Sequence, residues 1–262
     1  MASYEVIGSI AVMKFPEEEK ISIKEKKKVA EKLLEKNNVK TVVEKIGRIK
    51  GRLRTLKTKH LAGIKTLTTI HKENGCLMKV NIETCYFSPR LSEERKRIMK
   101  ECKNNEKVLV MFGGVAPYAI VIAKNKKEVK EVVSVEIGKE CSKYAQENVR
   151  MNKQEKKVRI IQGDVKKIIP RLKEKGEKYD RIIMTRPNLK ETFIKYALMV
   201  AKKGGMIHYH GFSHEEDKEE MVKELLEEIN NERRKVKVLK VMKVGDIAPR
   251  KYRWRIDMKI LN

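Results

Sequence analysis

Two adjacent glycines, Gly113 and Gly114, interrupt an apolar segment of the chain. Residues 108–112 form a short apolar run, and residues 118–123 resume with an apolar face at helical spacing. This order is typical of a buried parallel strand, a tight turn and a helix whose N-terminus faces a ligand. Glycine suits such a turn because a side chain would keep backbone N–H groups away from the ligand, and because the turn often needs a positive φ. The segment therefore predicts a ligand-binding turn.

Carboxylates follow at the ends of the next two predicted strands. One strand ends in Glu136, 22 residues after Gly114, and strand 158–161 leads into Gly163 and Asp164. An acidic residue roughly 20 residues past a glycine turn accepts hydrogen bonds from a ribose diol. A surface glutamate at a strand end of any doubly wound protein would give the same local pattern. Because three consecutive strand ends converge on one edge of the sheet, we interpret them as one nucleotide-binding crevice.

The composition is strongly basic. The chain has 62 lysines and arginines against 36 aspartates and glutamates, a formal net charge of +26. Such an excess favours nucleic acid or another anionic surface, although a lysine- and glutamate-rich surface of a heat-adapted protein is the alternative. The sequence contains no run of about 18 apolar residues and no basic flank before an apolar core at its start, so neither a membrane span nor a signal peptide is predicted. We expect a cytoplasmic protein.

Metal chemistry is not indicated. His208 and His210 alternate in strand 206–211 and share one face, but no third ligand can be named, so a packed strand end is the preferred interpretation. Cysteines lack the C-x-x-C spacing of zinc sites and disulfide frameworks, and we expect them to be reduced. They are Cys76, Cys85, Cys102 and Cys141.

The first 81 residues predict a small α+β domain. Apolar and β-branched patterns predict strands over 4–15, 39–49 and 61–70, and lysines alternate with an apolar stripe in a helix over 21–36. Between the last two strands lies a basic run, expected as a loop, whose density suits phosphate contacts although a solvated loop would tolerate it. Its cations are Arg48, Lys50, Arg52, Arg54, Lys57 and Lys59.

Residues 82–262 predict the second domain. After a strand over 80–87, Ser92 is expected to cap a helix that runs to about Cys102 and holds Glu94 in its first turn. Taken alone, Glu94 could be a surface residue paired with Arg90 or Arg95.

The rest of the second domain alternates strands with helices and then closes with an antiparallel pair. This order predicts a doubly wound, Rossmann-like α/β sheet of about seven strands. The expected later strands are 180–184, 206–211, 235–244 and 252–261, and the expected later helices are 139–151, 190–202 and 215–232.

Several motifs then occur in a fixed order along the chain. They are Gly51-x-x-Arg54-Thr55, His71-Lys72-Glu73-Asn74-Gly75-Cys76, Tyr86-Phe87-Ser88-Pro89-Arg90-Leu91 with Glu94-Arg95, Met111-Phe112-x-Gly114-Val115-x-Pro117, Ile207-His208-Tyr209 and Ala248-Pro249-Arg250. With them the chain resembles, over nearly its whole length, the archaeal and eukaryotic tRNA (guanine-37-N1)-methyltransferase family. The resemblance implies a class I methyltransferase domain, S-adenosylmethionine (SAM) as cofactor with S-adenosylhomocysteine as product, and a monomer that binds a tRNA anticodon stem-loop and not DNA.

The resemblance also implies roles for individual residues. Glu94 corresponds to the general base that removes the N1 proton, Arg54 to the arginine that stabilises charge on O6, and Tyr86 to an active-site tyrosine, while Thr185 and Pro187 stand where the family holds the target base. The implied cofactor-binding residues are Arg90, Phe112, Gly114, Val115, Pro117, Glu136, Ile137, Gly163, Asp164, Val165 and Thr185. The implied RNA-binding residues are Arg48, Lys50, Arg52, Lys57 and Arg250.

Three positions depart from the family pattern. Val110 replaces an aspartate, Ala116 replaces a glycine and is expected to keep a negative φ, and 185–187 replace Asn-Leu-Pro. Threonine offers one donor where the amide of asparagine offers two, which lowers base discrimination by about 1–3 kcal/mol. The additional N-terminal domain that family members usually carry is not recognised in the sequence, so we expect a less strict check of the tRNA shape.

Three functions remain open. The first is methylation of guanosine 37, or of the wyosine precursor made from it. The second is transfer of an aminocarboxypropyl group from SAM, as in a neighbouring family, and the third is tRNA binding by a decayed catalytic pocket. Retention of Glu94, Arg54 and Tyr86 favours methyl transfer.

Overall fold

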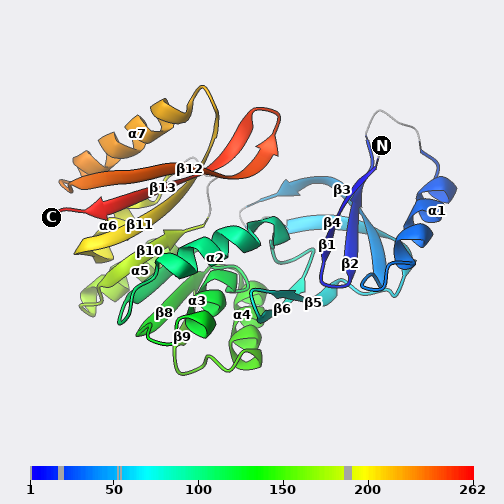
Figure 1. Ribbon diagram of the computed structural model, residues 1–262, viewed down its shortest axis with the longest axis horizontal. Helices are drawn as coiled ribbons and strands as arrows, with labels where there is room; N and C mark the ends of the chain where they lie inside the picture. The colour runs from blue at the N-terminus through cyan, green and yellow to red at the C-terminus, as the bar shows by residue number, and fades with distance from the viewer. Residues whose placement is uncertain (1, 17–20, 52, 54, 186–190) are drawn as a thin grey trace.

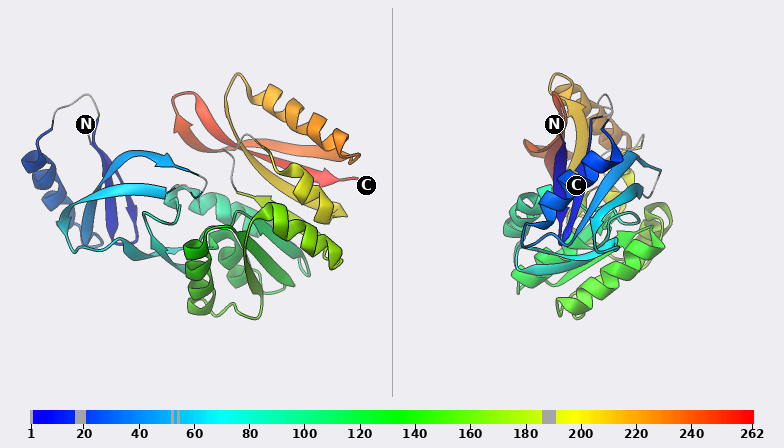
Figure 2. Two further views of the ribbon diagram at one scale, coloured as in Figure 1. Left: turned by 180° about the vertical axis from the view of Figure 1, so that it is seen from behind. Right: turned by 90° about the vertical axis from the view of Figure 1, so that its right-hand side faces the viewer.

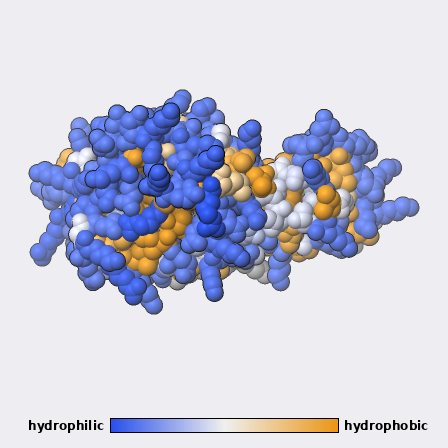
Figure 3. Space-filling view, turned by 90° about the horizontal axis from the view of Figure 1, so that it is seen from below, coloured by the Kyte–Doolittle hydropathy of each residue, from blue (hydrophilic) through white to orange (hydrophobic). Residues whose placement is uncertain are grey.

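The protein has a small N-terminal domain beside a larger α/β domain, arranged along the long axis of the molecule (Figures 1 and 2). The computed structural model describes residues 2–16, 21–51, 53, 55–185 and 191–262, without the side chains of 48–50. Hydrophilic residues cover most of the face shown in Figure 3. None of the helices in these ranges has the length and apolar character that crossing a membrane requires.

A four-stranded sheet and one helix form the small domain. The sheet has the order β1-β2-β3-β4, with only β2 and β3 parallel. Helix α1 begins with a capping box between Ser22 and Glu25 and buries Ala30 and Leu33 against the sheet. The elements are β1 (Ser3–Ile7), β2 (Ile10–Lys14), α1 (Ile23–Leu34), β3 (Thr41–Lys50) and β4 (Thr55–Gly63).

Three expectations for the first 70 residues were wrong. The single strand over 4–15 is a hairpin that turns at Gly8, whose φ is +56°, and the expected strand 61–70 is divided at Gly63, whose φ is +79°. The basic segment expected as a loop lies mostly in strands β3 and β4. In β4 the alternation of exposed residues, Lys57 and Lys59 among them, with half-buried ones is the pattern of a strand with one solvated face.

A two-stranded hairpin joins the two domains. It consists of β5 (Thr68–Glu73) and β6 (Cys76–Asn81). Toward the small domain, the backbone N–H of Ser9 donates to Thr69 Oγ1 at 2.9 Å. Toward the large domain, the amides of Asn148 and Asn152 bond both backbone groups of Lys79 and of Leu77. The two asparagines thus replace a neighbouring strand for β6, and the hairpin connects both domains.

The large domain is a seven-stranded doubly wound sheet, which confirms the predicted fold class. The strand order is β12-β13-β11-β10-β7-β8-β9, parallel from β11 to β9, with β13 antiparallel to both of its neighbours. The strands are β7 (Lys107–Met111), β8 (Glu131–Glu136), β9 (Val158–Gln162), β10 (Tyr179–Met184), β11 (Ala201–His214), β12 (Val236–Ala248) and β13 (Lys251–Ile260).

Helices cover both faces of this sheet (Figure 1). Helices α2, α3 and α4 pack on one face and α5, α6 and α7 on the other. Their bounds are α2 (Ser92–Glu101), α3 (Pro117–Asn125), α4 (Lys139–Met151), α5 (Val165–Glu174), α6 (Ile194–Val200) and α7 (Lys218–Asn231), and a short 3₁₀ helix covers Pro89–Leu91. Strand β7 is apolar on both sides, as expected of a central parallel strand.

The segment before α2 differs from expectation. The predicted strand 80–87 is wrong, because β6 ends at Asn81 and a turn follows. Ser92 is also not the N-cap: Leu91 holds that position, and Ser92 is the first residue of α2, where its Oγ and carbonyl oxygen accept from the Asn74 amide.

The glycine turn after β7 gives a test of packing against β8. A Cβ added to Gly113 would lie 1.9 Å from Ser134 Oγ but 3.3 Å from Ser134 Cβ. We therefore expect Gly113→Ala to lower the free energy of unfolding by about 1–3 kcal/mol, measured by urea denaturation.

Removing the clashing hydroxyl should restore most of that stability. The double variant Gly113→Ala, Ser134→Ala is compared with Ser134→Ala alone, in a double-mutant cycle. Additive effects of the two substitutions would show that the contact is not the reason for glycine here.

Candidate active site

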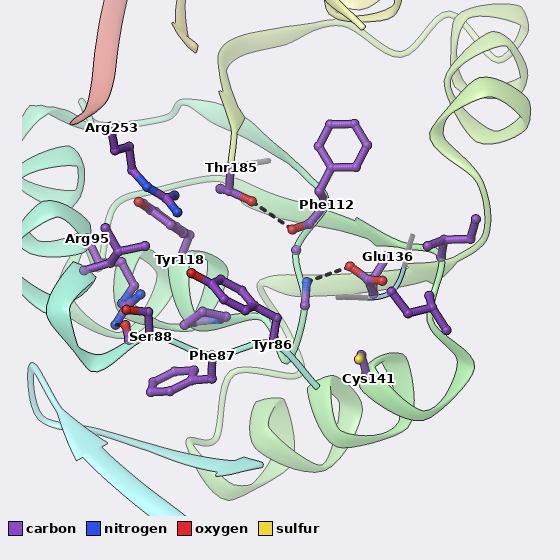
Figure 4. A pocket seen from close by; sticks show the side chains of 16 residues that line it. Tyr86, Phe87, Ser88, Arg95, Phe112, Tyr118, Glu136, Cys141, Thr185 and Arg253 are labelled. Carbon is purple, nitrogen blue, oxygen red and sulfur yellow. Dashed lines mark hydrogen bonds between the residues drawn. The ribbon is translucent and has the colours of Figure 1, made fainter. Parts of the chain in front are cut away.

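A pocket lies at the carboxyl ends of β7, β8 and β10. Figure 4 shows Glu136 and Cys141 on one side of it, Arg95, Tyr118 and Arg253 on the other, and Tyr86 between them. In doubly wound sheets the carboxyl ends of the parallel strands are where ligands bind. The sequence predicted a crevice at this edge, and the structure places a pocket there.

Backbone amides of the glycine turn face a carboxylate. Glu136 accepts hydrogen bonds from Gly114 N at 2.8 Å and Gly138 N at 2.7 Å. A carboxylate has about four lone-pair sites, so acceptors remain for a ribose diol. The expectation for Ala116 was wrong, because its φ is +66°, a left-handed conformation that costs a residue with a Cβ about 1–2 kcal/mol. The chain keeps the turn despite this strain.

Thr185 closes the pocket above the turn. Its Oγ1 lies 2.8 Å from the carbonyl oxygen of Phe112 and 3.2 Å from that of Met111. A hydroxyl has one proton to donate, and the backbone carbonyls take it. Thr185 therefore holds the end of β10 to the glycine turn, and toward a ligand it offers only acceptor sites.

Arg95 lies in the wall of the pocket opposite Glu136 and contacts several residues of that wall (Figure 4). Its guanidinium pairs with both carboxylate oxygens of Glu73, at 2.5 Å each, and donates to Ser88 O at 3.0 Å. The same group lies 5.2 Å from the centre of the Phe87 ring and 5.9 Å from that of Tyr118. Burial raises the pKa of Tyr118, so its hydroxyl stays protonated. Arg95 thus fixes the backbone that carries Tyr86.

Glu94 lies behind this wall and does not line the pocket. Its carboxylate is 2% exposed, and Oε1 accepts from Arg255 Nη1 at 3.0 Å and lies 3.5 Å from His210 Nε2. Burial opposes ionisation of Glu94, but His210 and Arg255 hold its pKa below the usual range. Glu94 is therefore ionised, although it is not among the residues that line the pocket.

A network of charged groups extends from Glu94 across the sheet. Arg255 also contacts Glu101 at 2.6 Å and Asp257 at 2.9 Å, and Asp257 contacts His208 Nδ1 at 2.6 Å. His208 Nε2 in turn contacts Arg181, which pairs with Glu106 at 2.8 Å. We call this set, with Glu94 and His210, the buried network.

Three members of the buried network have the spacing of a metal site. Ligand atoms of Glu101, His208 and Asp257 lie within 4.8 Å of one another. However, Arg255 contacts both carboxylates and Arg181 contacts the histidine. Guanidinium groups provide the positive charge there, so the cluster is an ionic network of the protein.

The structure brings together part of the predicted site. Seven predicted residues line the pocket: Tyr86, Phe112, Gly114, Pro117, Glu136, Ile137 and Thr185. Four other predicted residues do not line the pocket. Arg90 is exposed and pairs with Glu5 at 2.9 Å, and Val115 is buried in the core. Asp164 caps α5 by accepting a hydrogen bond from Lys166 N, and Glu94 is part of the buried network. Gly163 and Val165, which flank Asp164, do not line the pocket either.

Other predicted residues remain untested. Arg52, Arg54 and Pro187, and the side chains of Arg48 and Lys50, lie outside the described residues. Lys57 and Arg250 are exposed, as a contact to RNA would require.

Several lining residues were missed in the sequence. Tyr118 directly follows the predicted Pro117, and Arg253 shares a strand face with Arg255 and Asp257, so motif position and strand alternation were the available signals. The others are Leu53, Phe87, Ser88, Leu91, Arg95 and Cys141, whereas Gly113 belongs to the predicted ligand-binding turn.

A second hollow lies on the small domain. Lys14, Lys26, Lys45 and Lys59 line it, with Glu44 as the acidic residue among its lining. Burial, together with the nearby cations Lys14 and Arg90, lowers the pKa of Lys45. The cations are therefore close enough to repel one another, and an anion such as a phosphate would relieve that repulsion. We call this hollow the lysine groove.

Fold and pocket together define a SAM-dependent methyltransferase-type domain with an appended basic domain. Residues 69–239 match the TRM5/TYW2 methyltransferase domain, and residues 1–66 match the TYW2 N-terminal domain. The chain therefore belongs to the TRM5/TYW2 family of tRNA-modifying enzymes.

Two curated relatives are similar over nearly the whole chain. The tRNA (guanine(37)-N(1))-methyltransferase Trm5b of Pyrococcus abyssi is 37% identical over 98% of this chain and 74% of its own length. The tRNA (guanine(37)-N(1))/4-demethylwyosine(37)-methyltransferase Taw22 of Nanoarchaeum equitans is 34% identical over 99% of this chain and 100% of its own.

Solved structures are similar as well. A complex of aTrm5 with tRNALeu superposes with a TM-score of 0.85 and 32% identity, covering 99% of this chain and 72% of that one. The TYW2 of Pyrococcus horikoshii in complex with MeSAdo superposes with a TM-score of 0.81 and 27% identity, covering 99% and 90%. Relatives with this fold thus bind tRNA and an adenosyl compound.

The carboxylates of the buried network, together with Glu73 beside Arg95, predict a specific acid sensitivity. The pKa values of Glu73, Glu94 and Asp257 are lowered by the cations and histidines beside them, against the effect of burial. Their stabilisation is complete above the unfolded-state values of about 4 and is lost as the pH falls through the lower folded-state values. We expect the free energy of unfolding to decline gently below about pH 6.5, because burial lowers the pKa of His210 as well, and to fall steeply below about pH 4.

Two variants test the source of this sensitivity by urea denaturation at several pH values. Asp257→Asn should lower the free energy of unfolding by about 1–3 kcal/mol at pH 7 and make the acid decline shallower. Asp246→Asn, which removes an exposed pair with Lys243, should cost less than about 0.5 kcal/mol. Equal acid slopes for Asp257→Asn and the wild type would contradict the assignment.

Proposed function

We propose that this protein transfers a methyl group from SAM to N1 of guanosine 37, beside the anticodon of tRNA. The observation that carries the proposal is that one pocket joins Glu136 and the glycine turn to Tyr86, with an ionised Glu94 in the first turn of α2, the helix that follows Tyr86 in the chain. The similarity to guanosine-37 methyltransferases over 98% of the chain supports the same reaction. We further propose that the protein acts as a cytoplasmic monomer.

The residues present fit SAM. Glu136 would accept from the ribose hydroxyls, Gly114 leaves space for a close approach, and Ile137 and Cys141 give an apolar wall beside them. The cofactor supplies an activated methyl group on a sulfonium, so the protein has to position two substrates more than perform covalent catalysis.

Guanine presents a specific problem of proton transfer. N1 carries a proton and is a poor nucleophile, and negative charge develops on O6 when that proton leaves. Glu94 is the base we assign to this proton, because it is ionised and its Oε2 accepts no hydrogen bond from the described residues. Arg54, which lies outside the described residues, is assigned to O6 by its family position.

The tRNA would bind across both domains. The target base must be turned out of the anticodon stack to reach the pocket. The lysine groove and the exposed lysines of β4 provide contacts for the phosphates of the anticodon stem-loop. Leu53 of the small domain lines the pocket of the large domain, so both domains would face the flipped base.

The direct test is incubation with SAM and an unmodified tRNA transcript that carries guanosine 37, followed by digestion and mass spectrometry of the nucleosides. We expect a gain of one methyl group at that position. A tRNA with adenosine 37 is the control. Absence of any adduct on either guanosine 37 or a wyosine-precursor tRNA, with no SAM binding in calorimetry, would favour a decayed binding protein.

A second substrate is favoured by two observations. Residues 1–66 match the TYW2 N-terminal domain, and the relative that this chain matches over its full length is named for 4-demethylwyosine as well as guanosine. The same assay with a wyosine-precursor tRNA decides this: a methyl adduct assigns a dual substrate range, and an aminocarboxypropyl adduct moves the assignment to that transferase activity.

Glu94→Gln tests the base. The amide keeps the shape but cannot take a proton, so kcat should fall by about 10²–10⁴-fold while SAM affinity in calorimetry stays unchanged. Glu93→Gln is the matched control, because Glu93 is exposed and its contact is a 3.8 Å pair with Lys96. Full activity of Glu94→Gln would remove the assignment.

The lysine groove is tested by binding of an anticodon stem-loop at several salt concentrations. The double variant Lys45→Ala, Lys59→Ala should bind more weakly and lower the slope of log K against log salt by about 0.7–0.9 for each phosphate that it no longer neutralises. Lys173→Ala, on α5, should leave both affinity and slope unchanged. If the groove variant binds like wild type, the RNA lies elsewhere.

A further inference from the structure

His210 lies in the interior of the large domain, next to the assigned base. It is 1% exposed, and its Nε2 lies 3.5 Å from Glu94 Oε1. Neither of its ring nitrogens has a hydrogen-bond partner among the described residues. An imidazole with both nitrogens unsatisfied and a carboxylate within reach is unusual, because buried polar groups are normally hydrogen-bonded. The site is arranged so that a proton can be added there.

The charges of the buried network give a reason for such a proton. The network contains four carboxylates and two guanidinium groups in contact with them. The carboxylates are those of Glu94, Glu101, Glu106 and Asp257, and the guanidinium groups are those of Arg181 and Arg255. In a largely buried cluster such an excess of negative charge favours uptake of protons. The network also contains two imidazole rings, those of His208 and His210, as possible proton acceptors.

Both ring nitrogens of His208 already have a hydrogen-bond partner. Arg181 donates to its Nε2, since a guanidinium has no acceptor, and therefore the Nδ1–H of a neutral imidazole donates to Asp257 at 2.6 Å. Protonation of Nε2 would place two donors against each other. His210 has no such conflict, which leaves it as the acceptor next to Glu94.

The groups that face His210 come from three elements. Glu94 of α2 attracts a proton to the ring, whereas Arg253 and Arg255 of β13 repel it, and Tyr118 of α3 lies edge-on with ring centres 6.3 Å apart. Burial, with the two arginines, lowers the pKa of His210 against the effect of Glu94. The resting state is therefore an ionised Glu94 beside a neutral His210.

We propose that His210 shares with Glu94 the proton that N1 of guanine loses during methyl transfer. The proposal rests on the proposed function. The N1–H bond breaks as N1 bonds to the methyl carbon, the sulfonium sulfur keeps the electron pair of its broken bond, and the proton passes to Glu94 and then to Nε2 of His210. His210 acts through Glu94 and is a positioning residue: by taking over the proton it lets the pair bind that proton more tightly than Glu94 would alone.

The first test measures the coupling without any reaction. The protein is labelled with ¹⁵N-histidine, and the ring nitrogens are followed by NMR from pH 4.5 to 8 in the wild type and in Glu94→Gln. The variant His210→Gln identifies the signal of His210 among those of the five histidines. Loss of the anion should lower the titration midpoint of His210 by about one pH unit or more. The same midpoint in both proteins would overturn the proposal, whether or not the enzyme methylates tRNA.

The second test measures the reaction. In His210→Gln we expect kcat to fall about tenfold at pH 7, with the KM values for tRNA and SAM unchanged. The acid limb of the pH profile of kcat/KM should also move to lower pH, because Glu94 alone binds a proton more weakly than the pair does. His214→Gln, on the same strand, is the control. A merely structural role would lower the melting temperature and leave the acid limb in place, and that result would overturn the proposal.

The two tests distinguish a failure of this proposal from a failure of the proposed function. A wild-type protein with no methyl transfer to any guanosine-37 tRNA would refute the proposed function, whereas the NMR coupling would still decide whether Glu94 and His210 share a proton.

Discussion

The structure of the site depends on the contact between Arg255 and Glu94. These residues are 161 positions apart, and their pairing ties helix α2 to strand β13. Arg255 also contacts Glu101, about two helical turns further along α2, so the guanidinium sets both the position and the rotation of that helix. Because residues 86–91 lead directly into α2, the same contact determines where Tyr86 lies in the pocket. A change in this ionic contact would therefore alter the pocket before it altered the fold.

The sheet face under α2 to α4 has two different characters. Toward β7, β8 and β9 it is apolar, and Val108, Val110 and Val132 pack there in the usual way. Toward β10, β11 and β13 it carries the buried network. Burying ion pairs contributes little to stability compared with apolar packing of similar volume. We interpret the network as a device that keeps Glu94 ionised, which an apolar interface would not do.

The parts of the site that could be predicted depend on local signals. The glycine turn and Glu136 follow from the spacing of strands and turns, because one βαβ unit positions both. The buried network could not be read in this way. Arg181, His208 and Asp257 occupy strand positions where an alternating pattern suggests solvent, and only pairing between distant strands shows that the polar face is covered. Ala116 was misjudged because its left-handed conformation is imposed by the turn, against the preference of the residue.

The position of the small domain has a consequence for substrate recognition. The β5–β6 hairpin is hydrogen-bonded to both domains, and Leu53 of the β3–β4 turn reaches the pocket. Under the proposed function, a base in the pocket would therefore meet residues of both domains. Phosphate contacts fix the register of the RNA but carry no base identity. The small domain would thus determine which nucleotide is presented, and the pocket would determine whether that nucleotide reacts.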